Sequence, residues 1–404
     1  MINIYNSINY DMQANMQFNS RLCILLSTML MLQLSTVYSD NQWKSATFLS
    51  PKFELGPGSV ARKEYLDIQF PKGHISIKSV EAELVCEAGN PIPLDEAYLD
   101  HWSIIKYDEH KYKSDVSEGG GVNQQPSFIL SRNSGPCNDE ILPQFWGLGS
   151  ETRGTTTKVP DPFGIEAGNP NQVPYPYEEK WKLDIMVIDM RGVADRVGCI
   201  ECRCDLYNVT KDLKPNYKGG SLCCQDNTQC KVKCGFVAPR KTLQLRYTVR
   251  WVDWDQFQVP AKVYILDVTD NVGTSAQHNC QVEYDIEAKV GSTYSDVKKG
   301  SFPMANGGFV VYAVAHQHSG GLGSTLYGQD GRILCTSTPK YGTGKEVGNE
   351  EGYIVEMSTC YPQPGSIKIN NGEILTLQSN YNNSISHTGV VGHFYVLVAE
   401  QLQH

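Results

Sequence analysis

The clearest pattern along the chain is an alternation of apolar and polar side chains with a period of two. Its best example runs from 243 to 251, where Leu, Leu, Tyr, Val and Trp alternate with Gln, Arg, Thr and Arg. A shorter example follows at 282–286. Successive side chains of a β-strand point to opposite faces, so this period is typical of strands with one buried face. Since no segment after residue 40 carries a convincing helical period, we predict an all-β protein.

Turn residues separate the predicted strands. Asp330-Gly331 and Asn371-Gly372 each lie between two apolar stretches. Both dipeptides tolerate the positive φ of tight turns, so each predicts a β-hairpin. Many short strands with turns between them indicate a β-sandwich or barrel architecture.

The length of 404 residues exceeds one ordinary domain, and about 150 residues per domain suggests two. Residues 117–176 are rich in Gly, Pro, Asn and Ser, which is typical of a long surface loop that is functional or pinned by a disulfide. We place the domain boundary near residue 238, between a cysteine-dense segment and the strong strand. The expected organisation is a leader at 1–39, a first β-sandwich domain at 40–238 and a second at 239–404.

The leader has the layout of a secretory signal. Arg21 precedes the apolar stretch Leu22–Val37, which ends in a small-x-small site at Val37-Tyr38-Ser39. We expect cleavage there and export of the chain. The polar residues 1–20 leave a signal anchor in the membrane as the alternative.

Removing Cys23 with the leader would leave 12 of the 13 cysteines, and an even number in an exported chain predicts disulfides. The spacing Cys199-x-x-Cys202-x-Cys204 would suit zinc in a reducing compartment, whereas an oxidising one favours cystines. The sequons at Asn208 and Asn382 agree with export. The disulfide candidates are Cys86, Cys137, Cys199, Cys202, Cys204, Cys223, Cys224, Cys230, Cys234, Cys280, Cys335 and Cys360.

The formal net charge is −9, from 35 basic and 44 acidic residues. Without a basic stripe to neutralise phosphates, nucleic acid is not an expected partner. The chain has no run of 18 apolar residues, so no stable membrane span is expected once the leader is cleaved. The sequence points to no other partner.

The histidine pattern that carries a chemical signal is His316-Gln317-His318, at the end of the apolar run 309–315. Side chains two apart on a strand share a face about 6.5–7 Å apart, so both imidazoles could converge on one metal ion. Two hydrogen-bonded histidines at a strand end are the alternative. Further along, Val391 and His393 share one face of a second predicted strand.

Several segments resemble the plant stress up-regulated nodulin 19 family. They are PLDEAYLDHW at 93–102, GCIECRCDLYNV at 198–209, LCC at 222–224 and HTGV at 387–390. The resemblance covers nearly all of the chain after the leader. It implies a role in stress, and the family name states no activity.

A more distant resemblance is to the ascorbate-dependent type II copper monooxygenases, such as the peptidylglycine and dopamine hydroxylating enzymes. It is carried by 311–333 with its His-x-His, by the spaced Pro and Gly of 143–168, and by 372–376 followed by Tyr395. It implies two β-sandwich domains that face a solvent-filled cleft with one copper on each. One copper would supply electrons from ascorbate and the other would bind O2.

This resemblance matches only part of the copper ligands. His316 and His318 match the oxygen-binding site, whereas its thioether position falls on Val391, with His393 as a substitute ligand if the strand shifts by one pair of residues. The three histidines of the electron-entry site fall on Asp100, His101 and Met186. Hard oxygen favours the oxidised ion and soft sulfur the reduced one, so we expect this second site to be impaired or empty.

Three functions follow, in this order. The first is a secreted stress-associated protein on a copper-monooxygenase-like scaffold without catalysis. The second is a copper-binding protein that uses His316 and His318, and the third is a working copper monooxygenase. The sequence assigns no catalytic residue.

Overall fold

The computed structural model describes residues 43–112, 127–137, 142, 145–209, 212–271, 278–291 and 294–402. The chain divides into two compact units, Met1–Trp43 and Lys44–His404, and the second contains all of the described strands. The predicted leader at 1–39, with its signal-anchor alternative, lies outside the described residues. Among the described residues, no helix is long and apolar enough to span a membrane.

The all-β prediction is confirmed, because strands dominate and the described helices have three to five residues. The helical elements are η1 (Ser150–Arg153), α2 (Arg196–Ile200) and η2 (Cys204–Leu206). The strands are β1 (Lys44–Leu49), β2 (Phe53–Leu55), β3 (Val60–Tyr65), β4 (Ile75–Cys86), β5 (Ala97–His110), β6 (Phe128–Ser131), β7 (Trp146–Leu148), β8 (Phe163–Ala167), β9 (Tyr177–Asp189), β10 (Lys241–Asp253), β11 (Val259–Asp267), β12 (Glu283–Ile286), β13 (Asp296–Pro303), β14 (Gly308–Gln317), β15 (Gly321–Tyr327), β16 (Ile333–Ser337), β17 (Pro339–Tyr341), β18 (Ile354–Met357), β19 (Lys368–Ile369), β20 (Ile374–Tyr381) and β21 (His387–Ala399).

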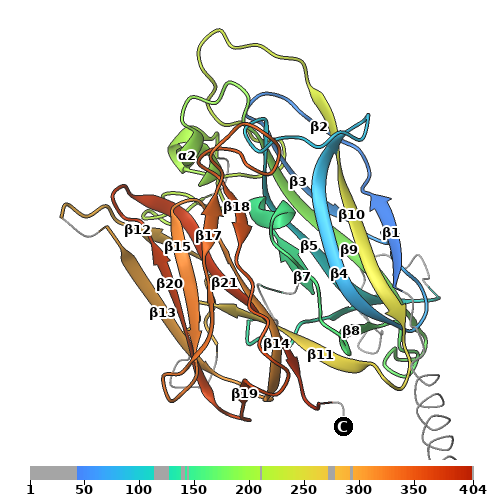
Figure 1. Cartoon of the computed structure of the whole chain (residues 1–404). Helices are drawn as coiled ribbons and strands as arrows, with labels where there is room; N and C mark the ends of the chain where they lie inside the picture. Colours follow the sequence, from blue (N-terminus) through green and yellow to red (C-terminus); the bar gives the residue numbers. More distant parts are fainter. Residues whose placement is uncertain are drawn as a thin grey trace, which may run out of the picture. The chain divides into compact units, whose positions relative to one another are not determined.

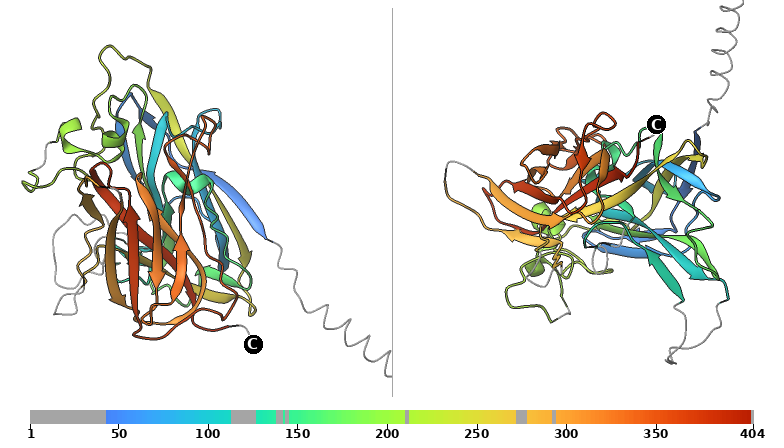
Figure 2. Two further views of the ribbon diagram at one scale, coloured as in Figure 1. Left: turned by 60° about the vertical axis from the view of Figure 1, so that its left-hand side comes forward. Right: turned by 90° about the horizontal axis from the view of Figure 1, so that it is seen from below.

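One large sheet runs through both halves of Lys44–His404, in the order β1-β10-β4-β8-β11-β21-β14-β19 (Figure 1). A five-stranded sheet is built from the early strands β3, β9, β5, β6 and β7, and a four-stranded sheet from the late strands β13, β20, β15 and β16. We call the strands up to β10 the early group and the strands from β11 onward the late group. The two groups meet where β8 and β11 pair in parallel, at Phe163↔Val259. Figure 2 shows the two groups from further directions.

The proposed domain boundary near residue 238 stays a prediction, as does the number of sandwiches. Strand β10, just after that position, pairs with β1, β2 and β4 from before it. The early group of strands therefore draws one strand from beyond residue 238.

Strand β10 forms where the alternation predicts it. Leu243, Leu245, Tyr247 and Val249 are buried, while the polar residues between them are half-buried. Trp251 is also half-buried. The period of two therefore reports one core-facing side of the strand, as expected for the large sheet.

The first predicted hairpin is confirmed and the second is wrong. Strands β15 and β16 pair antiparallel across Asp330-Gly331. The turn at Asn371-Gly372 also forms, with φ of 75° at Gly372, but β19 pairs with β14 whereas β20 pairs with β13 and β15. A turn dipeptide reverses the chain without deciding which strands pair, and here it leads from one sheet to another.

The described part of the segment 117–176 contains more regular structure than its composition indicates. Its described part contains β6, β7, η1 and β8, and both Trp146 and Leu148 are 2% exposed. The expected disulfide pin is present, because Cys137 is bonded to Cys280. The segment thus contributes to the core as well as to the surface.

Four disulfides are present in the described residues: Cys137–Cys280, Cys202–Cys224, Cys204–Cys223 and Cys335–Cys360. Two of them lie in the cysteine-dense segment, which removes the thiols that zinc would need at Cys202 and Cys204. The other candidates, Cys86, Cys199, Cys230 and Cys234, are free thiols in this structure.

Candidate functional site

Adjacent strands bring three histidines together. Strands β14 and β21 pair antiparallel with His316 directly opposite His393, and His318 follows the end of β14. The ring of His316 lies 5.4 Å from that of His318 and 6.1 Å from that of His393, between ring centroids. All three side chains are buried. Since this register sets His393 across from His316, His393 stays the candidate for the third ligand.

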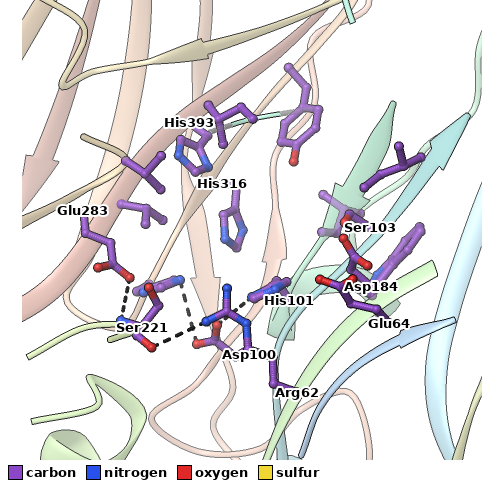
Figure 3. Close-up of a pocket in the computed structure, with 18 of the residues that line it drawn as sticks. Arg62, Glu64, Asp100, His101, Ser103, Asp184, Ser221, Glu283, His316 and His393 are labelled. Carbon is purple, nitrogen blue, oxygen red and sulfur yellow. Dashed lines mark hydrogen bonds and ion pairs between the residues drawn. The ribbon is translucent and has the colours of Figure 1, made fainter. Parts of the chain in front are cut away.

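These histidines line a pocket of about 410 Å³ between the early and late strands (Figure 3). His316 and His393 enter from the late strands, while His101, Ser103 and Asp184 enter from β5 and β9 on the other side. The remaining lining residues are Arg62, Glu64, Asp100, Trp102, Ile105, Leu130, Leu142, Leu148, Lys182, Ser221, Gln281, Val282, Glu283, His318, Val391 and Tyr395.

Asp100 lies between the two sets of candidate ligands. The pairing of β5 with β9 is irregular between Leu99 and His101, and Asp100 is the residue in that irregularity. One carboxylate oxygen lies 2.9 Å from Nδ1 of His101, and the other lies 4.0 Å from Nε2 of His318. The carboxylate thus contacts the imidazole of its chain neighbour and approaches the His-x-His pair.

The other two positions expected from the copper resemblance carry little ligand potential. Met186 lies opposite His101 across β5 and β9, but its side chain is 1% exposed and does not line the pocket. Val391 lines the pocket and has no donor atom.

Glu151, which the sequence analysis did not single out, orients His316. Its Oε1 accepts a hydrogen bond from Nδ1 of His316 at 2.6 Å, and the carboxylate is fully buried. A carboxylate on one ring nitrogen fixes the tautomer and directs Nε2 elsewhere, a common arrangement behind metal-binding histidines. Gly149 permits this approach, because a Cβ there would lie 2.8 Å from Cε1 of His316. No spacing rule links 151 to 316, so only the folded chain shows the pair.

The pocket is rich in carboxylates. Glu64, Asp100, Asp184 and Glu283 face it, against the two cations Arg62 and Lys182. Lys182 is shared between Glu64 at 3.0 Å and Asp184 at 3.2 Å. Burial raises the pKa of Asp184 and of Glu283. The balance of charge favours a cation over an anion in this space.

The pKa values of the buried histidines shift in different directions, although burial acts to lower each of them. It lowers the pKa of His318, opposed in part by the charge of Asp100, and it lowers that of His393 well below its usual range, helped by His316 and His318. For His316, burial alone would lower the pKa, but Glu151 raises it overall. Burial likewise acts to raise the pKa of Asp100, whereas His318 and His101 bring it below its usual value.

Two ring nitrogens in the pocket lack hydrogen-bond partners among the described residues. Nδ1 of His318 and Nε2 of His393 are both buried without one. A buried polar atom without a partner costs about 1–3 kcal/mol, so such atoms call for an explanation in a native structure. A bound ion would provide one.

The ligand atoms are not gathered tightly around one point. In the described part of the chain, a group whose ligand atoms all lie within 4.8 Å of one another is Cys137, Asp267 and Cys280, and the pocket histidines do not form such a group. Both sulfurs of the cysteine group belong to a disulfide, so they could bind metal only after reduction. An ion bonded at about 2 Å to three imidazoles would require side-chain rotation in the pocket.

Several solved structures are similar at a low level. PNGase F, a glycosylasparaginase from Flavobacterium meningosepticum, is 8% identical with a TM-score of 0.36, over 89% of this chain and 97% of that chain. A peptide-N(4)-(N-acetyl-β-D-glucosaminyl) asparagine amidase is 7% identical with a TM-score of 0.36, over 89% and 98%. The T13 particle of infectious bursal disease virus is 10% identical with a TM-score of 0.17, over 89% and 69%. These values support no conclusion about activity.

A comparison with curated proteins gives no match. The family model described as "Stress up-regulated Nod 19" matches residues 41–401, which is nearly the whole chain. The match covers every strand described above, including those that line the histidine pocket. The chain therefore belongs to the stress up-regulated Nod 19 family.

Proposed function

We propose that this family member is an exported, stress-associated protein that binds a transition-metal ion in the histidine pocket and does not catalyse hydroxylation. His316 and His318 would hold the ion, with His393 as the third imidazole after a side-chain rotation. Copper is the first candidate, because imidazole nitrogens suit it well.

The observation that carries this proposal is the pair of buried ring nitrogens, on His318 and His393, that have no hydrogen-bond partner in the part of the chain that the structure describes. Burial without a partner is unfavourable, and an ion would convert both atoms into ligands. The buried Glu151 supports the same interpretation, since it fixes the ring of His316 from behind as carboxylates do for metal-binding histidines.

The second copper expected from the monooxygenase resemblance does not fit the residues present. Asp100 is engaged by His101, and Met186 is buried away from the pocket surface. A carboxylate, one imidazole and a buried thioether are a poor set for an ion that must cycle between two oxidation states. We therefore derive no electron transfer between two coppers, and we propose no hydroxylation.

Export is part of the proposal. Four disulfides agree with folding in an oxidising compartment. Of the two glycosylation candidates, Asn208 is exposed and Asn382 is half-buried. Glycosylation of Asn208 and of Asn382 remains a prediction, as does cleavage of the leader.

Metal analysis of the protein secreted from an oxidising host tests the binding site. After Cu²⁺ loading and removal of loose metal, we expect about one ion per chain, with nitrogen hyperfine couplings in the electron paramagnetic resonance spectrum. His316→Ala and His318→Ala should each lose the ion. His74→Ala is the matched control, because His74 stacks on Trp254 and contacts Glu166 outside the pocket.

Two results would contradict the proposal. Retention of the same copper by His316→Ala, His318→Ala and the control would place the metal elsewhere. Ascorbate-dependent oxygen uptake that His316→Ala abolishes would instead establish the monooxygenase.

A metal-free pocket is the second candidate, and one observation favours it: among the described residues, the three pocket histidines do not form a group whose ligand atoms all lie within 4.8 Å of one another. In that case the protein keeps the scaffold without a metal, and the pocket is free for another ligand. Absence of metal from the loaded wild-type protein, with the fold intact by circular dichroism, would establish this candidate.

A further inference from the structure

Residues 199–230 of the cysteine-dense segment leave the core and return to it, and we call this stretch the excursion. Two nested disulfides cross-link it. The chain passes through α2 at Arg196–Ile200, turns, and returns near Cys230. In the sequence, the Cys204–Cys223 disulfide lies within the loop closed by Cys202–Cys224, so the two disulfides are nested and do not cross. The next cysteines outward on the two arms are Cys199 and Cys230.

These two cysteines meet in the structure. The arms that carry them run side by side, because the amide of Ala194 donates to the carbonyl oxygen of Lys231 at 3.1 Å. Both cysteines are buried, at 0% and 1% exposed, and their side chains are in contact. The hydroxyl of Tyr207 lies 3.1 Å from the sulfur of Cys199 and donates to its carbonyl oxygen at 2.9 Å. The two thiols therefore lie buried together at the base of the excursion.

We propose that Cys199 and Cys230 form a fifth disulfide in the mature protein, the outermost of three nested bonds. The free cysteine that follows in the sequence, Cys234, is a poorer partner for Cys230, because Cys234 is exposed whereas Cys199 is buried beside Cys230. Zinc is a poor alternative here, because a structural site requires about four ligands and the adjacent thiols are already in disulfides.

The chemistry is thiol–disulfide exchange with a small or protein disulfide, such as glutathione disulfide, as the oxidant. The two thiols lose two protons and two electrons and become one S–S bond, while the oxidant's disulfide is reduced to two thiols. Both thiols are buried in the folded chain, at 0% and 1% exposed, so a disulfide oxidant cannot reach them there. The exchange therefore belongs to the folding stage, before this part of the chain is buried.

The bond would fix one wall of the histidine pocket. Between the two cysteines, Ser221 lines the pocket, and its amide donates to Glu283 at 2.8 Å. Glu201 accepts a hydrogen bond from Nδ1 of His387 at the start of β21. A cross-link at the base of the excursion holds these contacts in place whether or not the pocket binds metal.

Mass spectrometry of the wild-type protein from an oxidising host tests the proposal directly. The protein is unfolded in denaturant with a thiol-alkylating reagent, without reduction, and then digested with trypsin. Cleavage after Arg196, Arg203, Lys211, Lys218 and Lys231 gives three cysteine-containing peptides, 197–203, 204–211 and 219–231, which the two observed disulfides keep together. If the fifth bond exists, this cluster carries no alkyl group and weighs two hydrogen atoms less than the dithiol form.

A single variant gives the matched control. Cys199→Ser should leave Cys230 as a lone thiol, so Cys230 becomes alkylated without reduction while the two inner disulfides persist. Alkylation of both Cys199 and Cys230 in the unfolded wild-type protein would overturn the proposal. So would protection of Cys230 in the Cys199→Ser variant, because it would show another partner. Neither result depends on metal binding in the pocket.

Discussion

Single residues decide how closely the chain approaches itself around the histidine pocket. The turn after His318 depends on Gly320, whose φ is +93° and whose α-carbon faces the ring of His387. A Cβ at this position would lie 2.6 Å from Cε1 of His387. Other side chains are excluded here both by backbone conformation and by space.

We predict that Gly320→Ala destabilises the protein more than Gly372→Ala. Both glycines have positive φ, which costs a non-glycine residue about 1–2 kcal/mol, but a Cβ at Gly372 meets nothing within 4 Å. The clash with His387 should add about 1–3 kcal/mol for Gly320→Ala. Free energies of unfolding from denaturant titration measure the difference. Equal losses would show that the His387 ring moves aside easily.

At the scale of elements, β21 is the strand on which the site depends. All 13 of its residues are buried, it pairs with β11, β12 and β14, and it carries Val391 and His393. Its first residue, His387, is held by Glu201 from the cysteine-dense excursion, and Glu201 also accepts from the amide of Thr388 at 3.2 Å. One buried carboxylate thus docks the excursion onto the strand.

Loss of this carboxylate should loosen the docking. We expect Glu201→Ala to lower the free energy of unfolding by about 1–3 kcal/mol, because it leaves the buried Nδ1 of His387 unpaired. Glu201→Gln keeps an acceptor and should lose less. Glu287→Ala is the control: its ion pair with Lys218 also joins the excursion to the late strands, but Glu287 is 72% exposed, so little change is expected. Thermal unfolding of the three variants compares them, and similar losses for Glu201→Ala and Glu287→Ala would argue against docking through Glu201.

At the scale of the whole molecule, the Cys137–Cys280 disulfide connects distant parts of the sequence. The two cysteines are 143 residues apart, and the bond joins the segment after β6 to the segment before β12. A cross-link over a longer loop restricts the unfolded chain more, so this bond should contribute more to stability than a local one.

The chain-entropy account makes this a quantitative prediction. It gives about 5 kcal/mol for the loop closed by Cys137–Cys280 and about 3.5 kcal/mol for the 25-residue separation of Cys335–Cys360. Replacing both cysteines of each pair by Ala should therefore lower the melting temperature more for the first pair. Calorimetry of the two double variants tests the order. The reverse order would mean that strain or residual structure, and not loop length, sets the contribution of these bonds.

The sequence by itself determined the features that depend on local chemistry. The period of two at 243–251 gave a strand with one buried face, and Asp330-Gly331 gave a hairpin, because neighbouring side chains decide both. The family segments were also legible without a structure, and the family match covers 41–401.

Only the tertiary structure decided the relations between distant segments. The turn at Asn371-Gly372 joins different sheets because strand pairing depends on packing, which a turn dipeptide does not determine. The register that sets His316 opposite His393, the approach of Glu151 to His316 and the position of Asp100 near His318 all join segments far apart in sequence. Spacing rules reach only along one element, so contacts of this kind emerge when several strands pack around the same pocket.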